Sequence, residues 1–163
     1  MYKFLILVIL MASCKQKDKS ECFSDLDAAT IITNGSTYDS LYAEKLEADK
    51  YGMHQYVMAF LKAGPNRDQS EEEATELQKG HMNNIGRLAE EGALVLAGPF
   101  LDDGDLKGIY IFKVGSIEEA EKLTKTDPAI KAGRLVMELH PWYGSAAIME
   151  VNEIHKRISK IKV

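Results

Sequence analysis

The sequence lacks the residue groups that bind structural or catalytic metals. It has two cysteines and four histidines, and no Cys-x-x-Cys or His-x-x-x-His spacing occurs among them. Because zinc sites are built from such groups of ligands, we expect no metal. The 163-residue chain is 45% hydrophobic, and a domain of this size buries roughly two thirds of its unfolded surface without needing a disulfide.

Sequence motifs for common cofactors and nucleophiles are also missing. The chain contains no G-x-G-x-x-G, no P-loop and no G-x-S-x-G elbow, which hold dinucleotides, phosphates and catalytic serines respectively. We therefore expect no cofactor. Basic residues are not in excess, since the formal net charge is −5. Binding to nucleic acid needs a basic surface, so we expect no nucleic-acid partner.

The apolar run from Phe4 to Met11 is too short to cross a bilayer, which takes about 20 residues. It follows Lys3 and precedes small residues, an order that is typical of a secretory signal. Residues 11–14, Met-Ala-Ser-Cys, resemble a bacterial lipobox. This interpretation makes residues 1–14 a signal peptide and predicts a lipid on Cys14, contact with the membrane through that anchor only, and a place in the cell envelope. The alternative is an ordinary cleaved signal that leaves the cysteine unmodified.

We expect residues 15–50 to form a polar tether and a short helix, and residues 51–163 to form one domain with a C-terminal helix. Strands are expected at 53–64, 93–100, 108–114 and 134–144, helices at 70–91 and 117–126, and one helical turn at 127–133. This β-α-β-β-α-β order predicts an α+β, ferredoxin-like fold. Apolar residues at helical spacing predict that the tail from Ser145 packs as an amphipathic helix through Ile148, Val151, Ile154, Ile158 and Ile161.

A two-layer fold of this kind leaves one face of its sheet without helices. Alternate strand positions are expected to give that face many aromatic residues, and such a face needs a cover. The positions are Tyr56, Met58, Phe60, Tyr110, Phe112, His140 and Trp142. A second copy of the sheet would supply the cover, so we expect a homodimer in the form of a dimeric α/β barrel. The alternative is cover by the terminal extensions of the same chain.

His81 interrupts the apolar stripe of the helix expected at 70–91. The other members of the stripe, three and four residues apart, are Ala74, Leu77, Ile85 and Leu88. One interpretation is a core histidine whose ring is hydrogen-bonded inside the fold. The other is a functional residue, because an imidazole titrates near neutral pH.

Asp127 begins the segment "DPAIKAG", where it would serve as a helix N-cap worth about 1 kcal/mol. The ferredoxin-like topology also puts both helices on one side of the sheet, so Asp127 could meet His81 at the edge of the gap between helices and sheet. A carboxylate beside an imidazole stabilises the charged ring and sets its tautomer. Such a pair suits general acid–base catalysis.

Three segments, "GHMNNIGRLAEEGALVLAGPF", "GIYIFKVGSIEEAEKL" and "DPAIKAG", resemble the YciI-like, or YCII-related, family. The segments "YGMHQYVMAFLKAGPN" and "HPWYGSA" are similar to a longer, secreted branch of it. The resemblance implies a dimeric ferredoxin-like α/β barrel. It also implies an active-site pair of a histidine and an aspartate, which by motif falls on His81 and Asp127. It implies no particular reaction.

Two hypotheses about function follow. In the first, the chain is a cofactor-free enzyme that carries out proton abstraction, elimination or isomerisation on a small organic molecule. His81 would move the proton and Asp127 would orient it, with Phe100, Tyr110 and Trp142 in an apolar pocket. In the second, the chain is a non-catalytic ligand-binding or assembly module, and the same pair positions a ligand or supports the fold.

Overall fold

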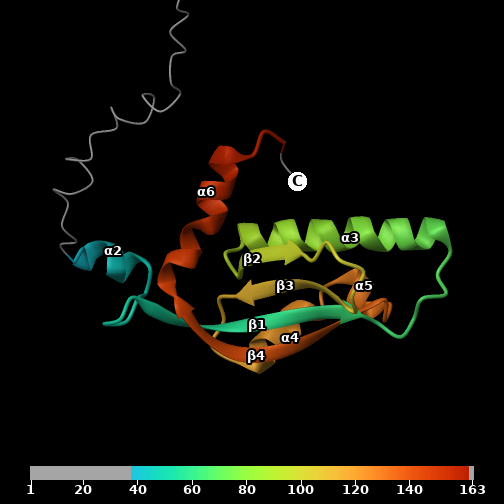
Figure 1. The fold of residues 1–163 in the computed structure, drawn as a ribbon, viewed down its shortest axis with the longest axis horizontal. Helices are drawn as coiled ribbons and strands as arrows, with labels where there is room; N and C mark the ends of the chain where they lie inside the picture. Colours follow the sequence, from blue (N-terminus) through green and yellow to red (C-terminus); the bar gives the residue numbers. More distant parts are fainter. Residues whose placement is uncertain (1–37, 162–163) are drawn as a thin grey trace, which may run out of the picture. The chain divides into compact units, whose positions relative to one another are not determined.

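The computed structural model describes residues 38–161 (Figure 1). The expected signal peptide and the expected lipidation site Cys14 lie outside the described residues. The elements are α2 Ser40–Lys45, β1 Met53–Ala63, α3 Glu71–Glu90, β2 Leu94–Pro99, β3 Leu106–Phe112, α4 Ile117–Thr124, α5 Pro128–Lys131, β4 Leu135–Ser145, the 3₁₀ helix η2 Ala146–Glu150 and α6 Val151–Ile158. Within residues 38–161, no helix combines the length and the apolar character that a membrane crossing requires.

The strands form one four-stranded antiparallel sheet in the order β2-β3-β1-β4. β1 lies inside the sheet, where Val57 pairs with Phe112 of β3 on one side and with Pro141 of β4 on the other. This strand order, reached by the chain order β-α-β-β-α-β, confirms the predicted α+β, ferredoxin-like fold.

One face of the sheet carries α3 and α4 and holds the main hydrophobic core. Leu88 of α3 and Ala120 of α4 are both fully buried in it. The strands contribute Val57, Ala59, Leu61, Leu94, Tyr110 and Phe112. Burial of one leucine side chain contributes roughly 1.5–3 kcal/mol, so this layer holds α3 firmly against the sheet.

The face predicted for Tyr110 and Phe112 is wrong. Both side chains lie on the helix-bearing face, because Tyr110 pairs with Ala59 and Phe112 pairs with Val57. Directly paired residues of antiparallel strands share a face of the sheet. Every residue of β3 from Ile109 to Phe112 is apolar, so alternation in the sequence could not distinguish the two faces, and the pairing register decides between them.

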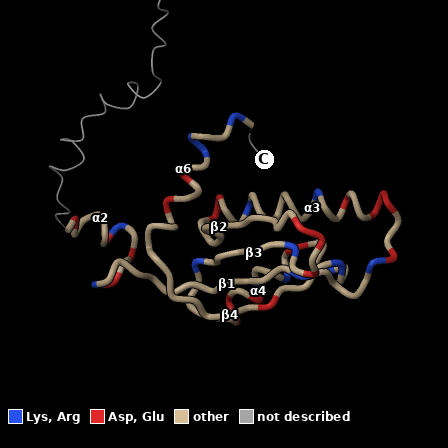
Figure 2. The backbone as a smooth tube through the Cα atoms, in the orientation of Figure 1, with Lys and Arg blue, Asp and Glu red and all other residues tan. Residues whose placement is uncertain are grey.

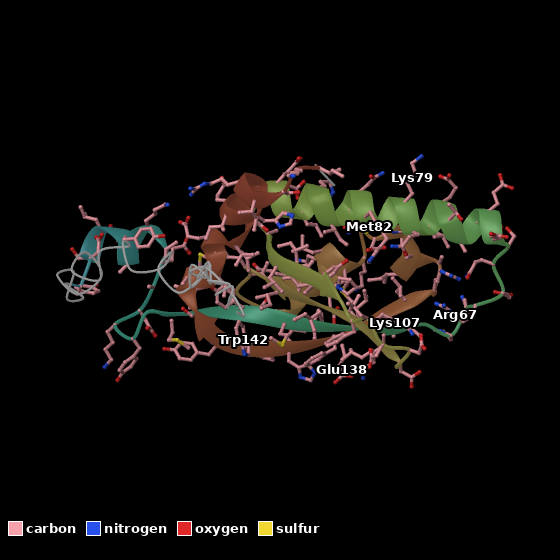
Figure 3. The ribbon with its side chains drawn as sticks, turned by 45° about the horizontal axis from the view of Figure 1, so that its top comes forward. Arg67, Lys79, Met82, Lys107, Glu138 and Trp142 are labelled. Atoms are coloured by element: carbon pink, nitrogen blue, oxygen red, sulfur yellow. The ribbon has the colours of Figure 1, made fainter. Side chains whose placement is uncertain are left out.

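The opposite face of the sheet is covered in part by the chain's own C-terminal segment. Ile148 and Met149 of η2 pack with Trp142 on a small cluster of Tyr56, Val95 and Ile111. Farther along this face, Glu138 accepts hydrogen bonds from Lys62 and from His140, whose imidazole is edge-on to Phe60. Figure 3 shows Trp142 and Glu138 on the side of the sheet away from α3. The sequence left open whether a second copy or the chain's own ends cover this face. In the structure, the chain's C-terminal segment covers part of it.

The C-terminal helix does not pack through its isoleucine stripe as predicted. Ile148 reaches the sheet, but Ile154, Ile158 and Ile161 are 50%, 74% and 78% exposed. The contact of α6 with β2 is polar instead, because Asn152 Nδ2 donates to the carbonyl of Leu94 at 2.8 Å. The 3₁₀ turn before α6 has about three residues per turn, so residues on the two sides of it no longer share one face.

The end of β1 touches the turn between α5 and β4 through backbone atoms. Gly64 donates from its N–H to the carbonyl of Arg134 at 2.8 Å. A Cβ placed on Gly64 would lie 2.2 Å from the carbonyl oxygen of Gly133, which has a φ of +69°. Glycine is therefore required at both positions, at Gly64 for close approach and at Gly133 for its backbone angle. This contact holds the segment that follows Asp127.

Candidate active site

The helix that carries His81 begins with a capping box. The Ser70 hydroxyl accepts from the N–H of Glu73 at 3.2 Å, and the Glu73 carboxylate accepts from the N–H of Ser70 at 2.9 Å. Acidic residues in the first turn add a favourable interaction with the helix dipole. From this start, His81, Asn84 and Leu88 fall at spacings of three and four and form the buried face of α3.

Asp127 both caps α5 and binds His81. Its Oδ1 accepts from the N–H of Ala129 at 2.8 Å, and its Oδ2 lies 2.6 Å from Nδ1 of His81. Asp127 is 0% exposed and His81 is 6% exposed. The two interpretations of Asp127 are therefore compatible, since one carboxylate performs both tasks with different oxygens. A carboxylate accepts only, so Nδ1 of His81 carries the shared proton and Nε2 of the neutral ring is the acceptor.

Tyr110 contacts the other ring nitrogen of His81, Nε2. Its hydroxyl lies 3.2 Å from Nε2 of His81, and the two rings are stacked at 20°. Burial, reinforced by the negative charge of Asp127, raises the pKa of Tyr110 well above its ordinary range. The phenol therefore keeps its proton and donates it to Nε2 of the neutral imidazole. If His81 becomes protonated, the same phenol oxygen can accept from Nε2.

Replacing Tyr110 with phenylalanine should make the domain less sensitive to alkaline pH. An unfolded tyrosine titrates near pH ~10, and the raised pKa means that the folded state holds this proton more tightly. The stabilisation is complete below that pH and is lost as pH rises toward the folded pKa. Urea unfolding would be measured in pH steps above about pH 9. The unfolding free energy of Tyr110→Phe should fall less steeply with pH than that of wild type. Tyr51→Phe, at a tyrosine that is 72% exposed, should keep the wild-type slope. Equal slopes for all three proteins would contradict the expectation.

The residues predicted to share a pocket are not brought together. Tyr110 contacts His81, but Trp142 lies on the opposite face of the sheet, where its ring centroid is 5.7 Å from that of Tyr56. Phe100 follows β2, is 44% exposed, and pairs through its N–H with the carbonyl of Lys107. The prediction of one pocket from Phe100, Tyr110 and Trp142 is thus wrong for Trp142, because its strand parity turns it away from His81.

A second polar group beside the pair was not predicted from the sequence. Asn84 Oδ1 lies 2.9 Å from Arg87 Nη2 and 2.8 Å from the Thr126 hydroxyl, which itself lies 2.9 Å from the same Arg87 nitrogen. Two residues of α3 spaced by three, His81 and Asn84, thus contact two consecutive residues, Asp127 and Thr126. That spacing on the stripe of His81 is the signal that could have identified Asn84.

Two surface hollows flank α3 near its start, and neither includes His81. The first is lined by Gln69, Glu73, Glu76, Leu77 and Ala132, and the second by Glu71, Ala74, Thr75, Gln78, Lys79, Met82 and Arg134. Acidic residues are concentrated in the first turn of α3, where the backbone trace is coloured red (Figure 2). Among the residues that the structure describes, no three His, Cys, Asp or Glu side chains are grouped as a metal site would require.

The YCII-related domain family matches residues 58–143, a span that includes His81 and Asp127. The chain belongs to the YCII-related family. The uncharacterised protein YjpA of Bacillus subtilis (strain 168) is similar to this YCII-related domain, with 32% identity over 63 residues, or 39% of this chain and 72% of that protein.

Among solved structures, the YCII-related domain is similar to a 5-chloro-2-hydroxyhydroquinone dehydrochlorinase from Burkholderia phenoliruptrix AC1100, in complex with 2,5-dihydroxybenzoquinone. The TM-score is 0.40 at 20% identity, over 53% of this chain and 92% of that chain. A likeness of that size carries no inference about the substrate of this chain.

Proposed function

We propose that this YCII-related protein is a cofactor-free enzyme that moves a proton on a small organic molecule. The observation that supports the proposal is the buried pair of His81 and Asp127, whose facing atoms are 2.6 Å apart, with Tyr110 on the remaining ring nitrogen. Asp127 fixes the tautomer in which Nε2 is basic. An acid–base group positioned in this way typically accelerates proton transfer by about a hundred- to ten-thousand-fold.

The proton path in this proposal runs through Tyr110. The phenol oxygen accepts a proton from the substrate while its own proton passes to Nε2 of His81. Tyr110 then carries no net charge at any stage, which agrees with the raised pKa of its phenol. The imidazolium that forms is stabilised by the Asp127 carboxylate. Return of the proton to another atom of the substrate completes an isomerisation, whereas departure of a leaving group with the electron pair completes an elimination.

A second candidate function is a non-catalytic ligand-binding or assembly module. The observation that favours it is that both ring nitrogens of His81 already have partners and the residue is 6% exposed. In that case the pair contributes to folding or positions a ligand, and its removal changes stability or binding without changing any rate.

Paired turnover measurements test the first function against the second. Wild type and His81→Ala would be incubated with a library of small organic metabolites, and consumption would be followed by mass spectrometry. A reaction that disappears in the variant, with circular dichroism unchanged, supports the enzyme. A reaction that continues at the wild-type rate in folded His81→Ala contradicts the role of His81. A lower unfolding free energy in His81→Ala, with no compound consumed by wild type, supports the binding module.

We also propose that the protein is anchored in the cell envelope by a lipid on Cys14 and that it forms a homodimer. The lipobox-like residues 11–14 support the first statement. The partly uncovered sheet face around Phe60 and His140 supports the second. Intact-mass spectrometry of the protein from its native host tests the lipid, and an unmodified N-terminus at another residue would exclude it. Light scattering at micromolar concentration tests the dimer, and a monomer alone would exclude it.

A further inference from the structure

The side-chain amide of Asn84 is held in one orientation. Arg87 can only donate hydrogen bonds, so the Asn84 atom 2.9 Å from Arg87 Nη2 must be the oxygen Oδ1. The Thr126 hydroxyl lies 2.8 Å from the same atom and 2.6 Å from the carbonyl of Leu123, so its one proton does not decide the orientation, and the Arg87 contact does. With Oδ1 held between these two residues, the amide nitrogen Nδ2 must point away from both.

The amide nitrogen of Asn84 has no hydrogen-bond partner among the described residues. Asn84 is 7% exposed, whereas no fully buried side-chain nitrogen or oxygen in the described part of the chain lacks a partner. Nδ2 must therefore keep contact with solvent through a small opening. The nearly buried amide therefore has two N–H donors that no described protein atom accepts, and a ligand oxygen could take the place of water there.

The position of this donor relates it to the proposed proton-transfer site. Asn84 lies three residues after His81 on the buried face of α3, so the two side chains are neighbours. His81 contacts Asp127 and Asn84 contacts Thr126, so two consecutive residues hold the two side chains in place. Asn84 therefore lies on the side of His81 that faces Thr126 and Asp127, and Arg87 polarises its amide.

We infer that Asn84 binds an oxygen atom of the substrate, of the carbonyl, enolate or phenolate class, next to His81. The inference rests on the proposed function, since it assigns a subsite of the same centre. An acceptor oxygen is the complement of two free N–H groups. Removal of a proton from a carbon beside a carbonyl puts negative charge on that oxygen, and donors aimed at developing charge stabilise the transition state.

Two variants distinguish the loss of the Asn84 N–H donor from a loss of folding. Asn84→Asp keeps an oxygen facing Arg87 and nearly the same shape, but it replaces the free donor with an acceptor. Asn83→Ala, at an exposed asparagine one position earlier on the same helix, is the matched control. Unfolding midpoints would first establish that both variants are folded.

The experiment is a titration of the full chain with 4-nitrophenolate, followed by the NMR signals of the Asn84 side-chain amide and the His81 ring. We expect the Asn84 N–H signals to shift, and the dissociation constant to rise about tenfold or more in Asn84→Asp, the usual cost of a hydrogen bond to a charged group. Asn83→Ala should bind as wild type does.

Three results would overturn the subsite. His81 signals that shift while those of Asn84 stay still would place the oxygen elsewhere. Equal affinity for Asn84→Asp and wild type would show that the donor is not used. An absence of shifts at both residues would exclude the phenolate class and the subsite with it. The proposed function fails separately, if folded His81→Ala retains turnover, and that result can occur whether or not the Asn84 signals shift.

Discussion

Asp127→Asn is expected to lower turnover by about a hundredfold or more while the domain stays folded. Oδ1 of the new side chain can still accept from the N–H of Ala129, so the cap of α5 survives. The amide nitrogen then faces Nδ1 of His81 in place of the carboxylate oxygen. An amide N–H donates, so Nδ1 must become the acceptor and the ring proton must move to Nε2.

The change of tautomer, and not a loss of structure, is the reason for the expected effect. With a proton on Nε2, the ring can donate to Tyr110 but can no longer accept a proton from it. The charge that would stabilise the imidazolium is also gone. We expect a stability loss of about 1–2 kcal/mol, because a charge-assisted hydrogen bond becomes a neutral one.

The measurement compares kcat/KM and the unfolding free energy of wild type, Asp127→Asn and Asp127→Ala. Both variants should lose turnover, but the alanine variant should also lose the cap, which is worth about 1 kcal/mol further. Nitrogen NMR of the His81 ring would report the tautomer directly. Turnover within a few-fold of wild type in Asp127→Asn would show that the carboxylate has no part in the reaction.

The pair was predictable from the sequence because each residue departs from a local rule. His81 is a titratable group on an apolar helix stripe, and Asp127 stands at a capping position. Neither fact alone required contact between them. The strand order added the missing constraint, since it put both helices on one face of the sheet, and the structure places the two side chains 2.6 Å apart.

Other features depend on how the strands pair, which the sequence alone does not determine. In β3 both faces are apolar, so only its register against β1 places Tyr110 beside His81. Without that register, the contact of Tyr110 with Nε2 could not be derived. The exposure of Ile154 and Ile158 has a related cause, because the 3₁₀ turn of η2 changes the direction in which α6 presents its residues.

Gly64→Ala is expected to destabilise the domain by about 3 kcal/mol, although Gly64 lies far from His81 in the sequence. The new Cβ would lie 2.2 Å from the carbonyl oxygen of Gly133 and 2.7 Å from the carbonyl carbon of Arg134. These are backbone atoms, so no side-chain rotation can relieve the clash. The chain must instead separate the end of β1 from the turn between α5 and β4.

The separation should reach the site because the same turn ends the helix that Asp127 caps. Gly133 and Arg134 follow α5 directly, and Asn66 also binds this turn, donating from its N–H to Gly133 and from Nδ2 to Ala132. Movement of the turn would pull on α5 and lengthen the contact of Asp127 with His81. We therefore expect Gly64→Ala to lose turnover as well as stability.

Gly86→Ala is the matched control for the stability effect. A Cβ at Gly86, within α3, would meet no atom within 4 Å, and alanine in a helix interior is favoured over glycine by about 1 kcal/mol. The same chemical change should therefore stabilise the domain at Gly86 and destabilise it at Gly64. Urea unfolding of the two variants measures the difference, about 4 kcal/mol in expectation. Equal stability would mean that the backbone contact between Gly64 and Gly133 does not hold α5 in place.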